Sequence, residues 1–240
     1  MVDEMKINGV LINDSNKIAE EFNNYFSSVG ETLAAKLPES QEHFSRFLGL
    51  RNEDDFRFNE VNEADLRETI NNFKDCSPGV DEVPMKLLKY CINELIKPIT
   101  HICNLSLHTG VFPKQWKHAI ITPIFKAGFN DLVSNYRPIS ILSSFSKIIE
   151  KVASDQLYDF IEQSNELDQS QYGFRSGGST EVALCDFVDD VLAAFDDEKY
   201  TVATFLDLSK AFDTVSHSIL LAELEHFGVM GWSCSGSPII

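Results

Sequence analysis

The sequence predicts an α+β domain that is rich in helix. Segments with an apolar residue at every third or fourth position dominate the chain, which is the spacing of an amphipathic helix. Only two short runs, AIITPIF (119–125) and TVATFLDL (201–208), have the nearly continuous apolar character of a covered strand. A length of 240 residues allows one or two domains, and 43% hydrophobic with 24% charged residues is ordinary for a globular protein.

Capping residues predict where the helices begin and end. Clear helical periodicity covers residues 14–30, 62–73 and 144–163. Asp14 or Ser15 caps the first of these helices, and Gly30 is expected to end it. Asp81 could cap a further helix. Pro98, in the apolar stretch that follows, either begins a new helix or kinks this one.

Two more helices are predicted in the C-terminal third. Ser179 or Thr180 caps one of them, Ser216 caps the other, and Gly228 ends the latter. The first is expected to turn toward the core a face made of Leu184, Phe187, Val188, Val191, Leu192 and Phe195. The segment KAGFNDLVSNYRP (126–138) is predicted to be a loop, because it is polar and contains turn residues.

Several classes of protein are excluded by composition. No run of about 18 apolar residues is present, so a transmembrane helix is not expected. The N-terminus MVDEMKING lacks the apolar region of a secretory signal. The five cysteines are scattered without a C-x-x-C pair, which predicts reduced thiols in an intracellular protein, with neither disulfides nor a zinc site.

The charge is strongly acidic but unevenly distributed. A net charge of −17 argues against a nucleic-acid-binding protein, because such proteins usually present a basic surface. Residues 113–151 nevertheless contain six Lys or Arg against two acids. This basic segment could line a phosphate-binding groove, or it could be an ordinary solvated face.

Asp207 stands at the end of the second predicted strand, between two leucines. An ionised carboxylate in such a place needs a partner or a metal ion, and aspartate oxygens suit Mg²⁺. Asp213 follows six positions later, but about 20 Å of extended chain and a turn put it on a different local face. The alternative is that Asp207 caps a turn and Asp213 caps the next helix.

Basic and glycine-containing turns are further candidates for phosphate contact. Lys126 and Arg137 flank the predicted loop, and Arg175 lies in the glycine-containing turn QYGFRSGGST (171–180). The same turn could simply lead into a helix. Phe212 is either a core residue or a steric wall beside a sugar phosphate.

Five motifs occur in order along residues 10–230. They are SPGVDEVPMKLLK, ITPIFK, NYRPISILSSFSKIIEKV, QYGFRSGGST and FLDLSKAFDTVSHSILL. Together they closely resemble the reverse transcriptase domain of non-LTR (LINE-type, jockey-like) retrotransposons. The segment FNNYFSSVG resembles the stretch that precedes the polymerase in these elements.

The resemblance implies a right-hand polymerase fold, here the fingers and an incomplete palm truncated after motif A. The implied divisions are an N-terminal helical extension and connector (1–60), fingers (61–200), the start of the palm with the motif A strand and helix (201–230), and a divergent tail (231–240). It also implies RNA-templated addition of dNTPs to a DNA primer 3′-OH, with Mg²⁺. Localisation inside the cell follows, in the nucleus for the parent element.

The resemblance also assigns roles to individual residues. Asp207 falls on the first catalytic aspartate and metal ligand of the family, and the backbone carbonyl of Leu208 is expected to be a second metal contact. Phe212 falls on the aromatic that screens the sugar 2′ position. Lys126, Arg137 and Arg175 fall on basic substrate-binding positions of the fingers. Asp213 falls on a structural position near the site.

The sequence departs from the family pattern in two places. Val80 and Glu82 stand where the family motif SPGPDG has Pro and Gly. From about Gly231 the pattern is lost, so the A-D-D motif with the remaining catalytic aspartates is absent, and the 240-residue chain is expected to be inactive. A non-catalytic RNA-binding or interaction module is the alternative function. An unpaired sheet edge in the incomplete palm would also make the chain poorly soluble.

Overall fold

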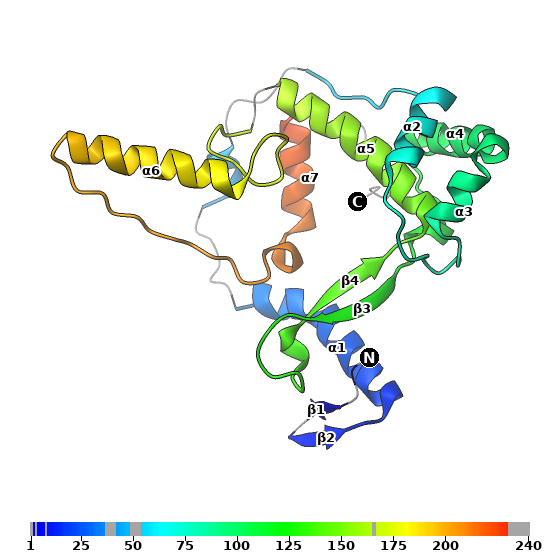
Figure 1. Cartoon of the computed structure of the whole chain (residues 1–240), viewed down its shortest axis with the longest axis horizontal. Helices are drawn as coiled ribbons and strands as arrows, with labels where there is room; N and C mark the ends of the chain where they lie inside the picture. The colour runs from blue at the N-terminus through cyan, green and yellow to red at the C-terminus, as the bar shows by residue number, and fades with distance from the viewer. Residues whose placement is uncertain are drawn as a thin grey trace.

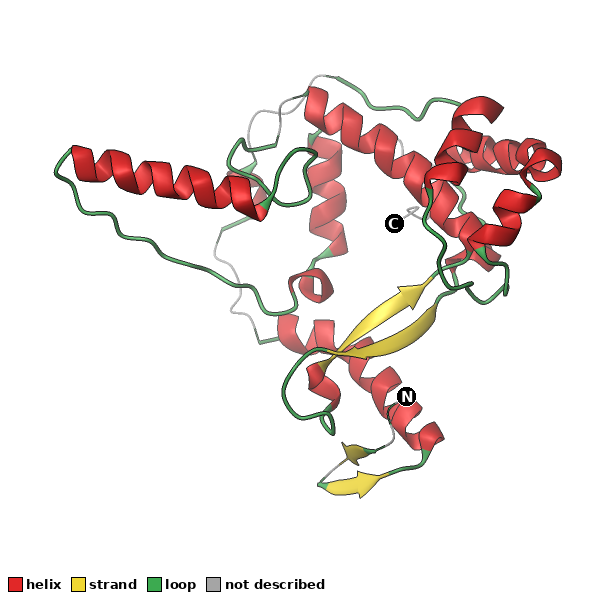
Figure 2. Ribbon diagram, in the orientation of Figure 1, coloured by secondary structure: helices red, strands yellow, loops and turns green. Residues whose placement is uncertain are grey.

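The computed structural model describes residues 2, 4–7, 9–36, 42–48, 54–164 and 167–229. In that part of the chain, helices α1–α7 are combined with two small antiparallel hairpins, which confirms the helix-rich α+β prediction (Figures 1 and 2). The elements are β1 (Met5–Ile7), β2 (Val10–Ile12), α1 (Ser15–Ala34), α2 (Glu63–Asn72), α3 (Met85–Tyr90), α4 (Ile92–Thr109), β3 (Ile120–Phe125), β4 (Tyr136–Ile141), α5 (Ser144–Gln163), α6 (Thr180–Asp196) and α7 (His217–His226). Short 3-10 helices cover η1 (Phe44–Phe47), η2 (Lys114–Lys117), η3 (Val133–Asn135) and η4 (Ala211–Thr214). No described helix is long and apolar enough to cross a membrane.

The main core lies between α2, α3, α4 and α5. It consists of fully buried side chains that recur at helical spacing, among them Leu66, Ile70, Met85, Leu88, Ile96, Cys103, Ile148 and Ile149. Burial raises the pKa of the Cys103 thiol to about 11, so this cysteine stays protonated and inert at neutral pH, as expected of a structural thiol.

A second, smaller core joins α1 to the hairpins β1–β2 and β3–β4. Met5, Ile18, Phe22 and Tyr136 are buried there. The Phe22 and Tyr136 rings meet edge to face with their centroids 5.0 Å apart. The β3–β4 hairpin therefore lies between α1 and the main core, as the ribbon shows (Figure 1).

Two of the sequence motifs meet where α5 begins. A Cβ on Gly79 would lie 2.5 Å from the backbone nitrogen of Ser143, so only glycine allows the Ser-Pro-Gly turn to come this close. Nearby, the Ser144 hydroxyl donates a hydrogen bond to the Val83 carbonyl at 2.8 Å. This contact fixes the turn before α3 against the first residues of α5.

Several predicted boundaries are confirmed and others are wrong. Asp14 caps α1, accepting from the backbone N–H groups of residues 16 and 17. Gly30 does not end α1, because the helix continues to Ala34. Asp81 does not cap α3: its carboxylate accepts from the Val83 N–H and closes a turn before Pro84. Pro98 begins no helix and lies inside α4.

The helix caps predicted near the C-terminus are also confirmed only in part. The Ser179 hydroxyl caps α6 by accepting from the Val182 N–H at 3.2 Å. Ser216 occupies the cap position of α7, but its hydroxyl accepts from no backbone N–H of the helix and instead shares a hydrogen bond of 2.9 Å with the Ser218 hydroxyl. Gly228, with φ of +90°, follows the end of that helix as predicted.

Strand predictions were less accurate than helix predictions. The run at 119–125 is confirmed as β3, but residues 136–138, assigned to a loop, begin its partner β4. Residues 201–208 are extended but form no strand, and their large apolar side chains are exposed. An apolar run becomes a strand only beside a partner with free backbone groups, and no described segment pairs with this one.

The predicted core face of α6 is also uncovered. No α6 residue is buried, and Leu184 and Phe195 are 61% and 78% exposed. In Figure 1 the helix extends away from the other elements, and the chain returns from it as the extended segment 197–209. The helix forms as predicted, but within the described residues its apolar face packs against no core.

Candidate functional site

The candidate site is the turn that follows the extended segment 201–208. Asp207 is exposed in that segment, and the chain first becomes partly buried at Lys210. Lys210 has a left-handed backbone with φ of 52° and begins η4. The N–H of Asp213 donates to the Lys210 carbonyl at 2.9 Å, so Asp213 takes part in closing the turn.

Helix α1 contacts this turn at two places. The Lys210 ammonium donates to the Tyr25 hydroxyl at 2.9 Å and lies 4.4 Å from the centre of the same ring. Five residues further along the helix, a Cβ on Gly30 would overlap the backbone carbonyl of Asp213. The turn therefore rests on two adjacent turns of α1.

Phe212 projects from the turn toward the glycine-containing motif. Its ring meets that of Phe174 at 5.9 Å between centroids and an interplanar angle of 81°. Both side chains are more than 80% exposed, so neither is a core residue in the described structure. The contact brings the motifs QYGFRSGGST and FLDLSKAFDTV together, although they are far apart in the sequence.

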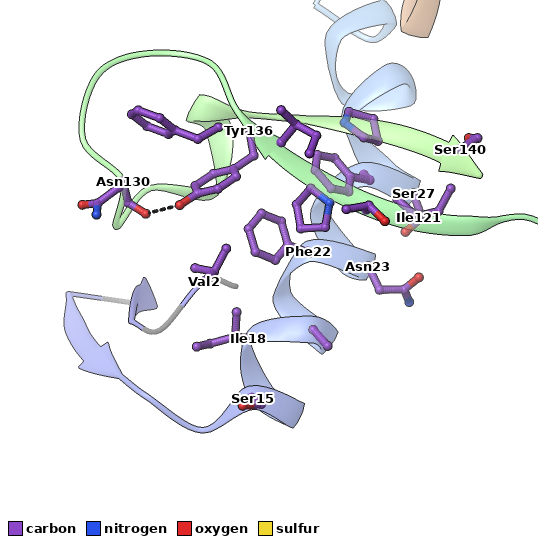
Figure 3. Close-up of a pocket in the computed structure, with 17 residues that line it drawn as sticks. Val2, Ser15, Ile18, Phe22, Asn23, Ser27, Ile121, Asn130, Tyr136 and Ser140 are labelled. Carbon is purple, nitrogen blue, oxygen red and sulfur yellow. Dashed lines mark hydrogen bonds between the residues drawn. The ribbon is translucent and has the colours of Figure 1, made fainter. Parts of the chain in front are cut away.

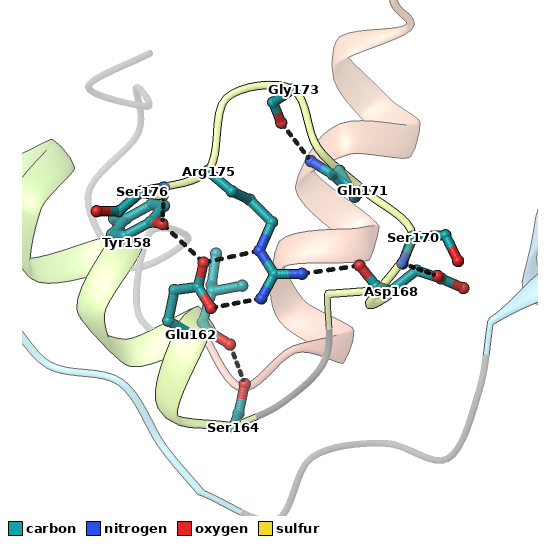
Figure 4. A network of polar contacts seen from close by, with 10 residues as sticks. Tyr158, Glu162, Ser164, Asp168, Ser170, Gln171, Gly173, Arg175 and Ser176 are labelled. Atoms are coloured by element: carbon teal, nitrogen blue, oxygen red, sulfur yellow. Dashed lines mark hydrogen bonds and ion pairs between the residues drawn. The ribbon is translucent and has the colours of Figure 1, made fainter. Parts of the chain in front are cut away.

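Arg175 is held in a polar network (Figure 4). Its Nε and Nη2 donate to the two carboxylate oxygens of Glu162, both at 2.9 Å, and its Nη1 donates to the Asp168 carbonyl at 2.8 Å. The Tyr158 hydroxyl donates to the same carboxylate at 2.7 Å and accepts from the Ser176 N–H at 2.8 Å. Arg175 thus secures the glycine-containing turn to α5.

This network lowers the pKa of the Glu162 carboxyl. The main cause is the hydrogen bond from Arg175, and the hydrogen bond from Tyr158 adds to it. Neither Glu162 nor Tyr158 belongs to a site motif that the sequence indicates. Their spacing of four on one helix places them on one face, but nothing in the sequence indicates that Arg175 meets both.

Lys126 and Arg137 lie on the β3–β4 hairpin. Arg137 pairs with Ile124, and the Lys126 N–H donates to the Asn135 carbonyl just beyond the last ladder pair. Because side chains alternate along a strand, the two basic residues share one face of the hairpin, and both are exposed. Phe125 and Tyr136 lie on the other face, toward α1.

An apolar groove of about 1210 Å³ separates that second face from α1 (Figure 3). Phe22 and Phe26 of α1 line one wall, and Ile121 and Pro123 of β3 line the other. At one end the Tyr136 hydroxyl donates to the Asn130 carbonyl at 2.7 Å. Neither Lys126 nor Arg137 lines this groove.

The described residues bring only some of the predicted site together. Phe212, Asp213 and the Arg175 turn are neighbours, and the turn after Asp207 joins them to α1. In residues 2–229, apart from the stretches left undescribed, no group of three or more His, Cys, Asp or Glu side chains is placed to hold a metal ion. Asp207 therefore offers one carboxylate, and a bound Mg²⁺ would need other oxygen ligands.

Comparison with known proteins gives a consistent family assignment. Residues 124–237 match the family described as reverse transcriptase (RNA-dependent DNA polymerase). The chain is 39% identical over 150 residues to a probable RNA-directed DNA polymerase from transposon BS of Drosophila melanogaster, and 35% identical over 159 residues to one from transposon X-element. It is 34% identical over 146 residues to the RNA-directed DNA polymerase from mobile element jockey of the same species.

These alignments cover 62%, 66% and 60% of the chain. The chain in turn spans less than a fifth of these relatives, namely 17%, 17% and 16% of their lengths. The matched residues 124–237 include the last two residues of β3, all of β4, the glycine-containing turn with Arg175 and the segment from Asp207 to Asp213. Residues 124–237 therefore belong to a reverse transcriptase domain, in the form found in jockey-like non-LTR retrotransposons.

Proposed function

We propose that the chain is part of an RNA-directed DNA polymerase that adds dNTPs to a primer 3′-OH on an RNA template. The observation that supports this most is the family match over residues 124–237, which contains Asp207 and Phe212 within one motif. In this proposal residues 61–200 are the fingers and residues 201–230 are the start of the palm. Residues 1–60 are the N-terminal extension.

Asp207 is proposed as a ligand of Mg²⁺, the ion that would neutralise the phosphates of the incoming nucleotide. Leu208 is proposed to add its backbone carbonyl, and Phe212 to screen the sugar 2′ position. A metal site of this kind needs several converging oxygen ligands, so the 240 residues by themselves are proposed to be inactive. Synthesis by the purified 240-residue chain on a primed RNA template would overturn that part of the proposal.

A chimera supplies the test of function. Residues 1–229 are joined to the downstream polymerase segment of the transposon BS relative, and primer extension is measured with Mg²⁺ and dNTPs. Asp207→Asn is expected to reduce synthesis by roughly 10²–10³-fold or more, because the metal loses a charged ligand. Asp213→Asn keeps activity if this residue is structural. Equal activity of Asp207→Asn and the unchanged chimera would refute the metal role.

Lys126 and Arg137 are proposed to contact the nucleic-acid backbone. Their common exposed face on the hairpin supports this, whereas Arg175 has three of its five N–H groups engaged by Glu162 and Asp168. Arg137→Ala is expected to weaken RNA binding and to reduce its salt dependence by about one ion. Arg57→Ala, which removes an exposed arginine outside the hairpin, serves as the matched control.

The same exposed basic face supports the alternative of a non-catalytic RNA-binding module. The two functions differ in one outcome. Salt-dependent RNA binding without synthesis by the chimera favours the binding module, and synthesis that depends on Asp207 favours the polymerase.

A further inference from the structure

We infer that α1 positions the turn that follows Asp207 and carries Phe212, and that Tyr25 and Gly30 are the positioning residues. Helix α1 lies outside the residues that match the family, so this role is not part of the family match. The inference rests on the proposed function only in taking this turn as part of a reaction site. The physical coupling between helix and turn stands on the contacts alone.

Close approach is the first observation. Gly30 lies in the interior of a 20-residue helix, a position where glycine weakens the helix. The absence of a side chain allows the backbone carbonyl of Asp213 to occupy the place of a Cβ. The obstructing atom belongs to the backbone, so even an alanine at position 30 would force the helix and the turn apart.

A charged contact is the second observation. Lys210 has a left-handed backbone, which is sterically disfavoured for any residue except glycine and needs support from its surroundings. Tyr25 gives that support in two ways: its hydroxyl accepts from the Lys210 ammonium, and its ring lies beneath the charge. Residues 201–209 are all exposed, so Lys210 is where the returning chain first becomes partly buried.

The preceding turn of the same helix holds the hairpin. Phe22 lies one turn before Tyr25 and packs edge to face on Tyr136 of β4. The basic face of the hairpin and the turn after Asp207 are therefore both attached to one rigid element. Helix α1 thus sets the position of the turn after Asp207, which carries Phe212, relative to Lys126 and Arg137.

Hydrogen exchange of the 240-residue chain tests this coupling. Tyr25→Ala is expected to speed exchange of the amides at 210–214 about tenfold, because both the hydrogen bond and the ring contact are lost. Tyr25→Phe, which keeps the ring, should speed it less, by about fivefold. Gly30→Ala should act on the same amides. Tyr90→Ala, a change of a tyrosine that is 88% exposed on α3, is the control and should change none of them.

The exchange rates of the α4 and α5 amides distinguish a positioning role of α1 from a contribution of α1 to overall stability. In the expected result they exchange at the wild-type rate in every variant, because they belong to the main core. Acceleration of equal size in α4, α5 and the turn would mean that α1 acts only on overall stability, and would overturn the inference. Unchanged exchange at 210–214 in both Tyr25→Ala and Gly30→Ala would also overturn it.

Variants of Lys210 test the same contact with Tyr25 without altering the sequence of α1. Lys210→Met is expected to reproduce the effect of Tyr25→Ala, and Lys210→Arg to restore slow exchange, since arginine keeps a donor and a charge over the ring. The double change Tyr25→Ala with Lys210→Met should be no worse than either alone. Additive effects would show that the residues act separately and would contradict the inference.

None of these measurements needs synthesis, so they can fail or succeed independently of the polymerase proposal. If the chimera makes no DNA but exchange behaves as expected, the proposed function fails and the coupling stands. If the chimera is active but the exchange rates at 210–214 do not change in the Tyr25 and Gly30 variants, the coupling is refuted and the proposed function stands.

Discussion

Glu82 has a left-handed backbone, with φ of 56°, in the turn before α3. Sequences with the family motif have glycine at this position, and a residue with a Cβ pays roughly 1–2 kcal/mol for this conformation. Glu82→Gly should therefore raise the free energy of unfolding by about 0.5–1 kcal/mol, after allowing for the greater freedom of glycine in the unfolded chain. Urea denaturation would measure this.

Glu82→Ala is the control for that change. It removes the charge but keeps the Cβ, so the strain remains and no gain is expected. If alanine stabilises the protein as much as glycine does, the effect is electrostatic and the backbone argument is wrong.

Glu162 should make the stability of the protein depend on pH. Its carboxyl has a pKa below the ordinary value of 4.5 because Arg175 and Tyr158 donate to it, so its contribution is complete above about pH 4.5. That contribution is lost as the pH falls through the lowered pKa, where the folded protein must take up the proton. The difference in melting temperature between wild type and Glu162→Gln should thus be constant near neutral pH and shrink below about pH 4.5.

Asp159→Asn, which neutralises an exposed carboxylate on the same helix, is the matched control for Glu162→Gln. It should leave the melting temperature close to that of the wild type near neutral pH. A difference between Glu162→Gln and wild type that does not vary with pH would show that the network contributes through packing and not through its charge.

The sequence indicates which residues are candidates for the site but not which residues they contact. Sequence motifs indicate Asp207 and Arg175 as site residues, whereas no motif indicates Tyr25 or Glu162. Tyr25 meets Lys210 across 185 positions of sequence, and Glu162 meets Arg175 across 13. Such contacts depend on how elements pack, which local spacing does not encode.

At the scale of elements, helices were predicted well because their periodicity is local. The predicted 144–163 coincides with α5, and α2 lies within the predicted 62–73. Strand β4 was missed because Pro138 and the polar residues before it are typical of a loop. The run 201–208 was wrongly predicted as a strand, because hydrophobicity alone does not supply a pairing partner.

Gly79→Ala tests the contact between the turn and α5. The added Cβ would lie 2.5 Å from the Ser143 nitrogen and 2.7 Å from the Leu142 carbonyl carbon, so backbone must move. A loss of about 1–3 kcal/mol in the free energy of unfolding is expected, as for other overpacked sites. Gly173→Ala, where no other group lies within 4 Å, should be close to neutral in the same urea titration. Equal stabilities of the two variants would contradict the contact.

At the scale of the whole molecule, apolar surface is concentrated on α6 and the segment after it. Phe187 of α6 lies beside Phe205, with ring centroids 6.3 Å apart, so the two surfaces are continuous. Leu192 is 56% exposed and Leu206 is 89% exposed. A continuous apolar surface of this kind favours association in water. Poor solubility is therefore expected from these exposed side chains, in addition to the unpaired strand edge considered from the sequence.

The 240-residue chain should therefore self-associate at micromolar concentration, and Leu192→Lys should reduce the association. Burying such a leucine stabilises a contact by about 1.5–3 kcal/mol, so a charge there weakens association at least tenfold. Leu105→Lys is the matched control, because Leu105 is 51% exposed on α4, away from α6. Sedimentation velocity at several concentrations would compare the three proteins. A wild-type monomer at all concentrations, or an equal effect of the two lysines, would show that α6 and the following segment do not drive association.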